Sequence, residues 1–111
     1  MQLIPSIDLR GGNSVRLFKG NFAQETRYEL SPLELLERYA TLGAQWLHIV
    51  DLDGARDGQL ANRAVIVALA ERQRVKLQVG GGLRSAAVID DLLQAGVARV
   101  VLGSAAVEQT D

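Results

Sequence analysis

The sequence predicts an α/β fold whose main strands lie parallel in one sheet. Predicted strands alternate with predicted helices along the 111 residues, and short loops join them. The strands read as largely apolar on both faces, which is the pattern of a sheet covered by helices. A weak internal repeat matches residues 42–50 to residues 95–103, as expected of a structure built from repeated units.

The N-terminal region predicts a hairpin that is followed by a long loop. Residues 2–8 form the first predicted strand, because their apolar side chains are followed by a glycine-rich stretch. Residues 15–18 are a second extended run, and the Gly-Gly-Asn turn at residues 11–13 can join the two as a hairpin. Residues 19–30 are polar and lack periodicity, so we expect a loop there, and long loops of this kind are often functional.

The next segment carries a strong signal for the start of a helix. Ser31 can cap the helix, Pro32 suits its first position and Glu34 completes a capping box. Apolar residues then recur at helical spacing up to Gly43, which fits the end of the helix. The remaining elements are predicted as strands over residues 45–51, 75–79 and 98–102, helices over residues 62–72 and 85–96, and a last helical turn after Gly103 and Ser104.

The length of the chain limits the architecture to one domain over residues 1–111. A closed (βα)8 TIM barrel takes about 250 residues, so this chain has room for roughly half of one, with four parallel βα units. A small open sheet of the flavodoxin type is the alternative. A half barrel leaves the edges of its first and fourth strands and an apolar inner face uncovered. We therefore expect self-association into a homodimer or a larger even assembly.

Composition excludes several classes of function. The chain has 12 Lys and Arg against 13 Asp and Glu, which argues against nucleic-acid binding and a polybasic membrane anchor. It has no cysteine and one histidine, so we expect no disulfide and no metal site. The N-terminus does not resemble a signal peptide, and the apolar runs are too short to span a membrane. We expect a soluble, cytoplasmic protein.

Several polar residues fall at the ends of predicted strands. Asp8 ends the first strand, where a carboxylate faces the crevice in which parallel α/β folds bind ligands. Asp51 and Asp53 end the next main strand on one side of it, and two close carboxylates can divide acid and base roles, although Asp53 also suits an ordinary turn. His48 lies on the opposite face from Asp51, and a lone strand histidine is more often a packed residue than a catalyst.

Two glycine-rich turns point to a phosphate site. Gly81 and Gly82 belong to a triple-glycine turn before a helix, where bare backbone and free N–H groups can hold an anion. Gly103 and Ser104 repeat that arrangement after the next strand, and adjacent strand ends of this kind often bind phosphate in βα barrels. Tight turns alone would also explain the glycines. Arg16 in the N-terminal hairpin could pair with a phosphate, although a solvated surface role is the default for a single arginine.

Four segments occur in an order and spacing that resemble a known family. They are residues 4–9 (IPSIDL), 46–55 (WLHIVDLDGA), 78–85 (QVGGGLRS) and 102–107 (LGSAAV). Together with Val-Arg-Leu at residues 15–17, they resemble the N-terminal half of the HisA family. That family comprises the phosphoribosylformimino-5-aminoimidazole carboxamide ribotide isomerases of histidine biosynthesis, which are βα barrels of two similar halves. The related HisF cyclase is the nearest alternative, and the second segment looks more like the isomerase.

The resemblance implies a reaction and a set of residues. The reaction is an Amadori rearrangement of an aminoaldose to an aminoketose in a doubly phosphorylated ribotide, without metal or cofactor. It implies that Asp8 is the catalytic base. The family's second catalytic aspartate and second phosphate site lie in its C-terminal half. The implied ligand-binding positions form one phosphate site at Gly81, Gly82, Gly103 and Ser104 and the substrate neighbourhood at Arg16, His48 and Arg84, to which we add Asp51 as a candidate.

Three readings of function follow from these residues. The chain is the N-terminal half of an isomerase that is weakly active or inactive alone, a non-catalytic half-barrel assembly unit that binds phosphate or sulfate, or half of a HisF-type cyclase. If two copies close around a two-fold axis, a second Asp8 takes the place of the missing aspartate. We expect no nucleic-acid or membrane partner.

Overall fold

The structure of the chain is a computed structural model that describes residues 4–18, 21–27, 30–57, 61–81, 83, 85–102 and 105–108. Its strands form one mixed, seven-stranded sheet in the order β3-β2-β1-β4-β5-β6-β7. The parallel part consists of β1 (Ser6–Arg10), β4 (Trp46–Asp51), β5 (Lys76–Gly80) and β6 (Arg99–Leu102), which neighbour one another in chain order. The predicted α/β class is thereby confirmed, and the parallel β/α units are consistent with a partial TIM barrel.

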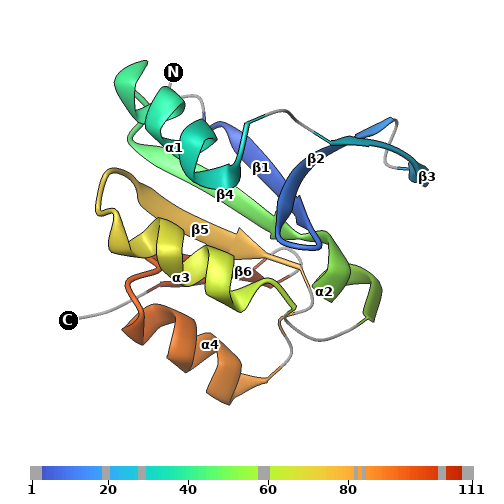
Figure 1. Ribbon diagram of the computed structural model, residues 1–111. Coiled ribbons are helices and arrows are strands. Elements are labelled where there is room, and N and C mark those ends of the chain that lie inside the picture. The colour runs from blue at the N-terminus through green and yellow to red at the C-terminus, as the bar shows by residue number, and fades with distance from the viewer. Residues whose placement is uncertain are drawn as a thin grey trace.

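Antiparallel strands extend the sheet on both sides of this parallel part. The expected N-terminal hairpin is present, with β2 (Asn13–Phe18) antiparallel to β1, and β3 (Asn21–Arg27) continues it outward (Figure 1). On the other side, β7 (Ala105–Glu108) lies antiparallel to β6. These two additions change which strand edges are exposed.

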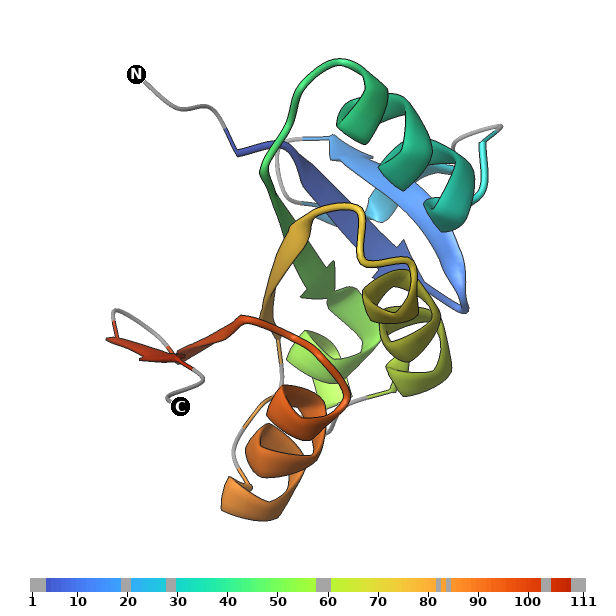
Figure 2. The same ribbon diagram turned by 90° about the vertical axis from the view of Figure 1, so that its left-hand side faces the viewer.

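Three helices cover one face of the sheet (Figures 1 and 2). They are α1 (Pro32–Thr41), α3 (Arg63–Glu71) and α4 (Ala86–Gln94). The predicted capping box of α1 is confirmed, because the Ser31 side chain accepts from the Glu34 N–H and the Glu34 side chain accepts from the Ser31 N–H. A bidentate pair from Arg63 to Asp91, at 2.6 and 3.0 Å, links α3 to α4.

The hydrophobic core lies between these helices and the sheet. Alternate strand residues point into it, and Leu36 of α1, Ile66 of α3 and Leu92 of α4 pack against them with 0% exposure. Burial of this apolar face supplies the main driving force for the fold. The strand residues that meet the helices are Ile7, Leu9, Leu47, Ile49, Leu77, Val79 and Val100.

Three predicted elements differ from the structure. The loop expected over residues 19–30 contains β3, because the edge of β2 offers backbone partners to a segment with little apolar pattern of its own. The helical turn expected after Ser104 is wrong, since residues 105–108 form β7 by pairing with every residue of β6. A short helix, α2 (Leu52–Asp57), follows β4 directly and was not expected. The fourth βα unit therefore has no helix among the described residues.

The expected surfaces for self-association also differ from the structure. Residues 8–10 of β1 pair with β2, and all of β6 pairs with β7, so neither strand has the fully free edge that we expected. The prediction that the strands are apolar on both faces is wrong as well. The face opposite α1, α3 and α4, which we call the open face, carries mostly polar side chains at alternate strand positions.

Candidate functional site

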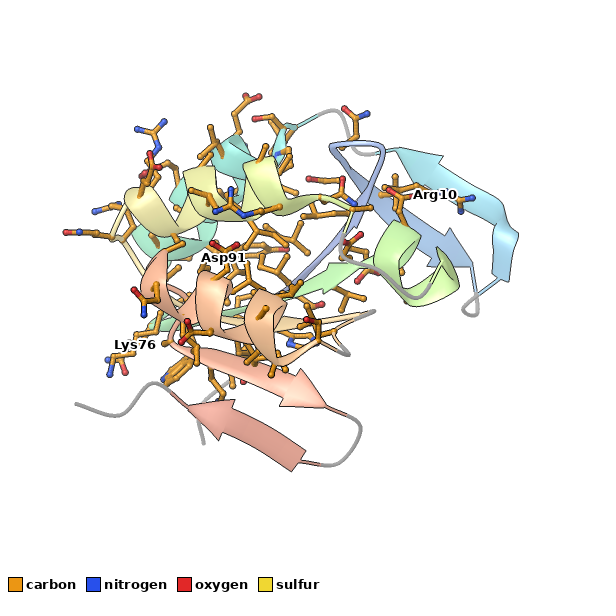
Figure 3. The ribbon with its side chains drawn as sticks, turned by 90° about the horizontal axis from the view of Figure 1, so that it is seen from below. Arg10, Lys76 and Asp91 are labelled. Carbon is orange, nitrogen blue, oxygen red and sulfur yellow. The ribbon has the colours of Figure 1, made fainter. Side chains whose placement is uncertain are left out.

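The parallel strands all end at one edge of the sheet, and this edge gathers the candidate residues. Figure 3 views the chain from below, with Arg10 at the end of β1 and Lys76 at the start of β5 on opposite sides of the molecule. Asp8 lies near the carboxyl end of β1, Asp51 ends β4, and Gly81 follows β5. In parallel α/β folds this is the edge at which ligands bind.

Strand alternation places Asp8 and His48 together on the open face. The burial pattern of β4 alternates strictly, so His48 lies on the open face while Asp51 lies on the helix face, as the sequence predicted. Ser6 pairs with His48 in the register of β1 and β4, and Asp8 is two residues further along β1. Asp8 and His48 are therefore diagonal neighbours, close enough for their charges to interact.

The partial burial of this pair changes the acidity of both groups. Burial raises the pKa of Asp8 above its ordinary value, and the nearby His48 offsets part of this effect. Burial lowers the pKa of His48, and Asp8 offsets part of that effect. Asp8 is thus a stronger base than an exposed aspartate, and the neutral imidazole of His48 is favoured beside it.

A row of polar residues continues from His48 across the open face. His48, Gln78 and Arg99 are partners in the register of β4, β5 and β6. The side-chain amide of Gln78 lies 2.9 Å from the Nδ1 atom of His48. Arg99 donates to the Gln78 Oε1 atom through Nε at 3.0 Å and through Nη2 at 2.6 Å. The row therefore links three consecutive parallel strands through their side chains.

Trp46 supports this row from the amino-terminal side. The Arg99 guanidinium lies 4.3 Å from the centroid of the Trp46 ring, and the Lys76 ammonium lies 5.6 Å from it. Both distances are within the range of cation–π attraction. The tryptophan thus holds the arginine in place while the arginine contacts Gln78.

Asp51 lies on the other face and is enclosed by donors. It is 0% exposed, and its carboxylate accepts from the Gly54 N–H, the Ala61 N–H and both the N–H and the side-chain amide of Asn62, at 2.6 to 3.0 Å. A buried carboxylate needs such partners to offset its desolvation. In this position Asp51 fastens α2 and the start of α3 to the end of β4. Direct contact between Asp51 and a ligand stays a prediction.

Asn62 extends this network to the β1–β2 turn. Its side-chain amide donates to Asp53 at 3.0 Å, and its side-chain oxygen accepts from the Gly12 N–H at 2.8 Å. Asp53 also accepts from the Gly11 N–H at 2.7 Å and lies 3.8 Å from Arg10. Asp53 therefore lies in α2 and anchors the β1–β2 turn, rather than forming the turn before Gly54 that its sequence context suggested.

Gly81 fits its position because no side chain can occupy the space. Its φ is +100°, in the region that favours glycine, and a Cβ atom there would lie 2.5 Å from the carbonyl oxygen of Asp51. The turn after β5 therefore runs directly against the end of β4. This close approach brings the triple-glycine turn to the carboxyl edge where the phosphate site is predicted.

The structure tests the position of only part of the predicted site. It brings Asp8 and His48 together on the open face, and it sets Asp51 and Gly81 side by side at the carboxyl edge. Arg16 belongs to β2, but the description does not extend to its side chain. Four further predicted positions lie outside the described residues: Gly82, Arg84, Gly103 and Ser104.

Sequence reasoning missed the partners of His48 and Asp51. Gln78 and Arg99 are polar residues that alternate with apolar residues in their strands, and this alternation is the signal that could have identified them. Asn62 directly precedes α3, so its sequence context suggests an ordinary N-cap. No pattern in the neighbouring residues indicates that its side chain contacts Asp51 and Asp53.

The described part of the chain also limits other kinds of site. Within it, no helix has the length and apolar character that crossing a membrane requires. No group of three or more His, Cys, Asp or Glu side chains converges there in a way that could hold a metal ion.

The fold and the site together define a class of protein. Consecutive parallel β/α units in one sheet, with Asp8 and Asp51 toward the carboxyl edge, are consistent with part of a βα barrel. The chain belongs to the histidine biosynthesis protein family, whose model matches residues 2–111, and within it to the HisA family. The family suggested by the sequence motifs is thereby confirmed.

The chain is similar to curated bacterial proteins that are named imidazole-4-carboxamide isomerases. It is 53% identical to the protein of Brevibacillus brevis over 104 residues, which cover 94% of this chain and 42% of that protein. It is 49% identical to the protein of Dehalococcoides mccartyi over 111 residues, which cover 100% of this chain and 46% of that protein. The chain thus spans less than half the length of these relatives, and the match corresponds to an N-terminal half.

Proposed function

We propose that this chain supplies the N-terminal half of a cytoplasmic ribotide isomerase of histidine biosynthesis. The reaction is an Amadori rearrangement of a doubly phosphorylated aminoaldose to the aminoketose, without metal or cofactor. The observation that carries the proposal is the half-buried Asp8 carboxylate beside His48 on the open face. The isomerase names of the related proteins support the same reaction in preference to a cyclase.

Asp8 is the proposed base of this reaction. After an acid protonates the ribose ring oxygen and the ring opens to an imine, a base must remove the proton from the neighbouring carbon. The electrons of that C–H bond then move toward the imine nitrogen, and the resulting enaminol tautomerises to the aminoketose. The raised pKa of Asp8 suits proton removal, because a stronger base removes a carbon-bound proton more readily.

The phosphate site is proposed at the glycine-rich turns after β5 and β6. The backbone at Gly81 lies against the end of β4 at the carboxyl edge, which is where we propose that the anion binds. Gly82, Gly103 and Ser104 complete the proposed site through their backbone N–H groups. Arg84 and Arg16 are proposed to add positive charge near the ligand.

The second catalytic aspartate requires a second half barrel. We propose that two copies of the chain pair about a two-fold axis, so that the partner's Asp8 supplies the acid and a second phosphate site lies across the barrel. The proposed pairing of two copies requires a change at the β6–β7 pair. β7 occupies the edge of β6 that the next parallel strand of a barrel would use, so closure requires β7 to leave that edge.

Substitution of Asp8 tests the catalytic proposal. Asp8→Asn keeps the size of the side chain and removes the base, so isomerisation of the ribotide should fall by about 10²- to 10⁴-fold, or to the background rate. Asp90→Asn changes an exposed carboxylate on α4 and is the matched control, with the rate of the parent. Equal residual rates in Asp8→Asn and the parent would remove Asp8 from the mechanism.

A non-catalytic assembly unit that binds phosphate is the second candidate. The observation that favours it is the open face itself, which no described helix covers. Its described strands present one aspartate, Asp8, whereas the proposed reaction needs a base and an acid. Light scattering with and without a bisphosphorylated ligand, together with the isomerase assay, separates the two functions. A dimer that binds ligand without turnover supports the assembly unit, whereas turnover that depends on Asp8 supports the isomerase.

A further inference from the structure

The polar row on the open face contains two residues to which the proposed reaction gives no task, Gln78 and Arg99. We propose that they are positioning residues that hold the neutral ring of His48 as the tautomer with its proton on Nε2. The tautomer itself follows from the contacts within the chain. Only its use in catalysis rests on the proposed isomerase function.

The orientation of the Gln78 amide is the first step. An amide can be reversed by rotation about its last bond, so its oxygen and nitrogen must be assigned from their partners. Arg99 offers donors only, and two of its nitrogens, Nε and Nη2, lie 3.0 and 2.6 Å from the same Gln78 atom. That atom must therefore be the oxygen, and the NH₂ group must point the other way, toward His48.

The tautomer of His48 is the second step. The Gln78 NH₂ group lies 2.9 Å from the His48 Nδ1 atom and can only donate. Nδ1 must then accept, so it carries no proton. In a neutral imidazole one ring nitrogen is protonated, and the proton is consequently on Nε2.

Arg99 fixes the direction of the hydrogen bonds from Arg99 through Gln78 to His48. Its guanidinium does not lose its proton in proteins, so it cannot become an acceptor and allow the amide to reverse. The Trp46 ring, 4.3 Å from the guanidinium, and the register of β5 with β6 hold it at this position. The order of donation from Arg99 to Gln78 to His48 is thus set by the one residue that cannot change its role.

The charge state of His48 is controlled from both sides of the strand. Burial disfavours the imidazolium and Asp8 on β1 favours it. The Gln78 NH₂ group on β5 also opposes it, because protonation of Nδ1 would set two donors against each other. Arg99 on β6 acts on the ring through Gln78. In the proposed isomerase, the Nε2–H group is a fixed donor for an oxygen or nitrogen atom of the ribotide beside Asp8.

Nuclear magnetic resonance of the imidazole tests the inference directly. His48 is the one histidine of the 111-residue chain, so ¹⁵N- and ¹³C-labelled histidine in a protein without a histidine tag reports on this ring alone. We expect the nitrogen and carbon shifts of the Nε2–H tautomer at pH values above the His48 titration. An Nδ1–H ring, or an even mixture of the two tautomers, would overturn the inference whatever the activity of the protein.

Two variants test the roles of the positioning residues. Gln78→Glu replaces the donor by an acceptor, so Nδ1 should take up the proton and the titration of His48 should move to higher pH. Arg99→Met removes the constraint on the amide, so a mixture of tautomers should appear. Arg74→Met is the control, because Arg74 pairs with Glu37 away from this face and should leave the ring signals unchanged.

The folded state of each variant is checked by circular dichroism before its spectra are interpreted. A folded Gln78→Glu chain with an unchanged tautomer and titration would overturn the inference. If that variant does not fold, the tautomer of the parent and the response to Arg99→Met decide the question. Loss of the isomerase proposal alone would leave these resonance results unaffected, since none of them requires substrate.

Discussion

The helix face and the open face of the sheet are made from the same strands, yet they are stabilised in different ways. On the helix face, Leu47, Ile49 and Val79 are 0% exposed and pack against α1, α3 and α4. On the open face, His48 and Gln78 occupy the alternate positions of the same strands and are joined by a side-chain hydrogen bond. Consecutive residues of one strand thus contribute either to the core or to the candidate site.

This difference has a simple physical basis. Apolar side chains on the helix face gain stability from leaving water, and the gain depends on close packing. Polar side chains at the centre of the open face, such as His48 and Gln78, are half-buried, so each needs a partner, and the register of parallel strands supplies one on the neighbouring strand. Alternation along each strand therefore places the side chains that stabilise the fold on the helix face and those of the candidate site on the open face.

Neighbouring substitutions in β4 should show the largest effect of this difference. Ile49→Ala removes a fully buried side chain from the helix face and should lower the free energy of unfolding by about 2–5 kcal/mol. Val50→Ala, one residue later on the open face, is the matched control and should cost about 1 kcal/mol. Chemical denaturation measures both, and equal losses would show that the faces do not differ in this way.

At the carboxyl edge, where the two faces meet, the expected difference between a variant and its control is smaller than that between Ile49→Ala and Val50→Ala. Gly81 and Gly43 have nearly equal φ values, +100° and +99°, but a Cβ atom at Gly43 has nothing within 4 Å, whereas one at Gly81 would contact the Asp51 backbone. Gly43→Ala should cost about 1–2 kcal/mol from backbone strain alone. Gly81→Ala should cost a further ~1–3 kcal/mol, because the turn must move away from β4.

Thermal or chemical unfolding of these two variants measures the close approach separately from the strain. The difference between the two losses, rather than either loss alone, reports the contact with Asp51. If the two variants lose the same free energy, the turn after β5 relaxes without cost, and its position against β4 does not matter for stability.

The smallest expected effect concerns Asp8 and depends on pH. Its pKa is raised in the folded state, so the carboxyl group favours folding below the ordinary range of Asp, and this contribution is lost as pH rises through the folded pKa. Asp8→Asn avoids the buried charge and should therefore raise Tm slightly at neutral pH. The gain should disappear below about pH 4, the ordinary range for Asp.

Asp90→Asn, at an exposed position, is the control for this pH series and should not change Tm in the same way. His48 also contributes to the pH dependence of stability, and Asp8→Asn should lower its pKa further by removing the Asp8 charge. Because its pKa is lowered on folding, its contribution to stability is present above about pH 6.5, its ordinary value, and is lost as pH falls. A gain in Asp8→Asn that persists unchanged into acid would show that the charge of Asp8 is not its cause.

Local sequence signals predicted most of the fold. The capping box at Ser31, the strand–glycine junction at Gly81 and the alternation of strands with helices each depend on a few neighbouring residues, and the structure contains all of them. β3 and β7 were not predicted, because each forms by pairing with another strand rather than from a pattern of its own.

The candidate site was predicted less completely for a related reason. Counting along one strand predicted that His48 and Asp51 lie on opposite faces. The approach of His48 to Asp8 and its link through Gln78 to Arg99 depend instead on the register between strands. Register is set by the packing of the whole sheet, so it leaves no mark within a single strand. The donors around Asp51 come from the loop and helix that follow it and are hidden in the same way.

The order of the strands has a consequence for how the chain can fold as it is synthesised. Each parallel strand lies beside the one made before it, and β2, β3 and β7 each pair with the strand that precedes them along the chain. A growing chain can therefore add each new strand to a strand already in place, although β4 must first reach back to β1 across β2, β3 and α1. The addition of β4 is therefore the step with the longest loop closure, whereas β2, β3 and β7 can each pair as soon as they follow their partner strand.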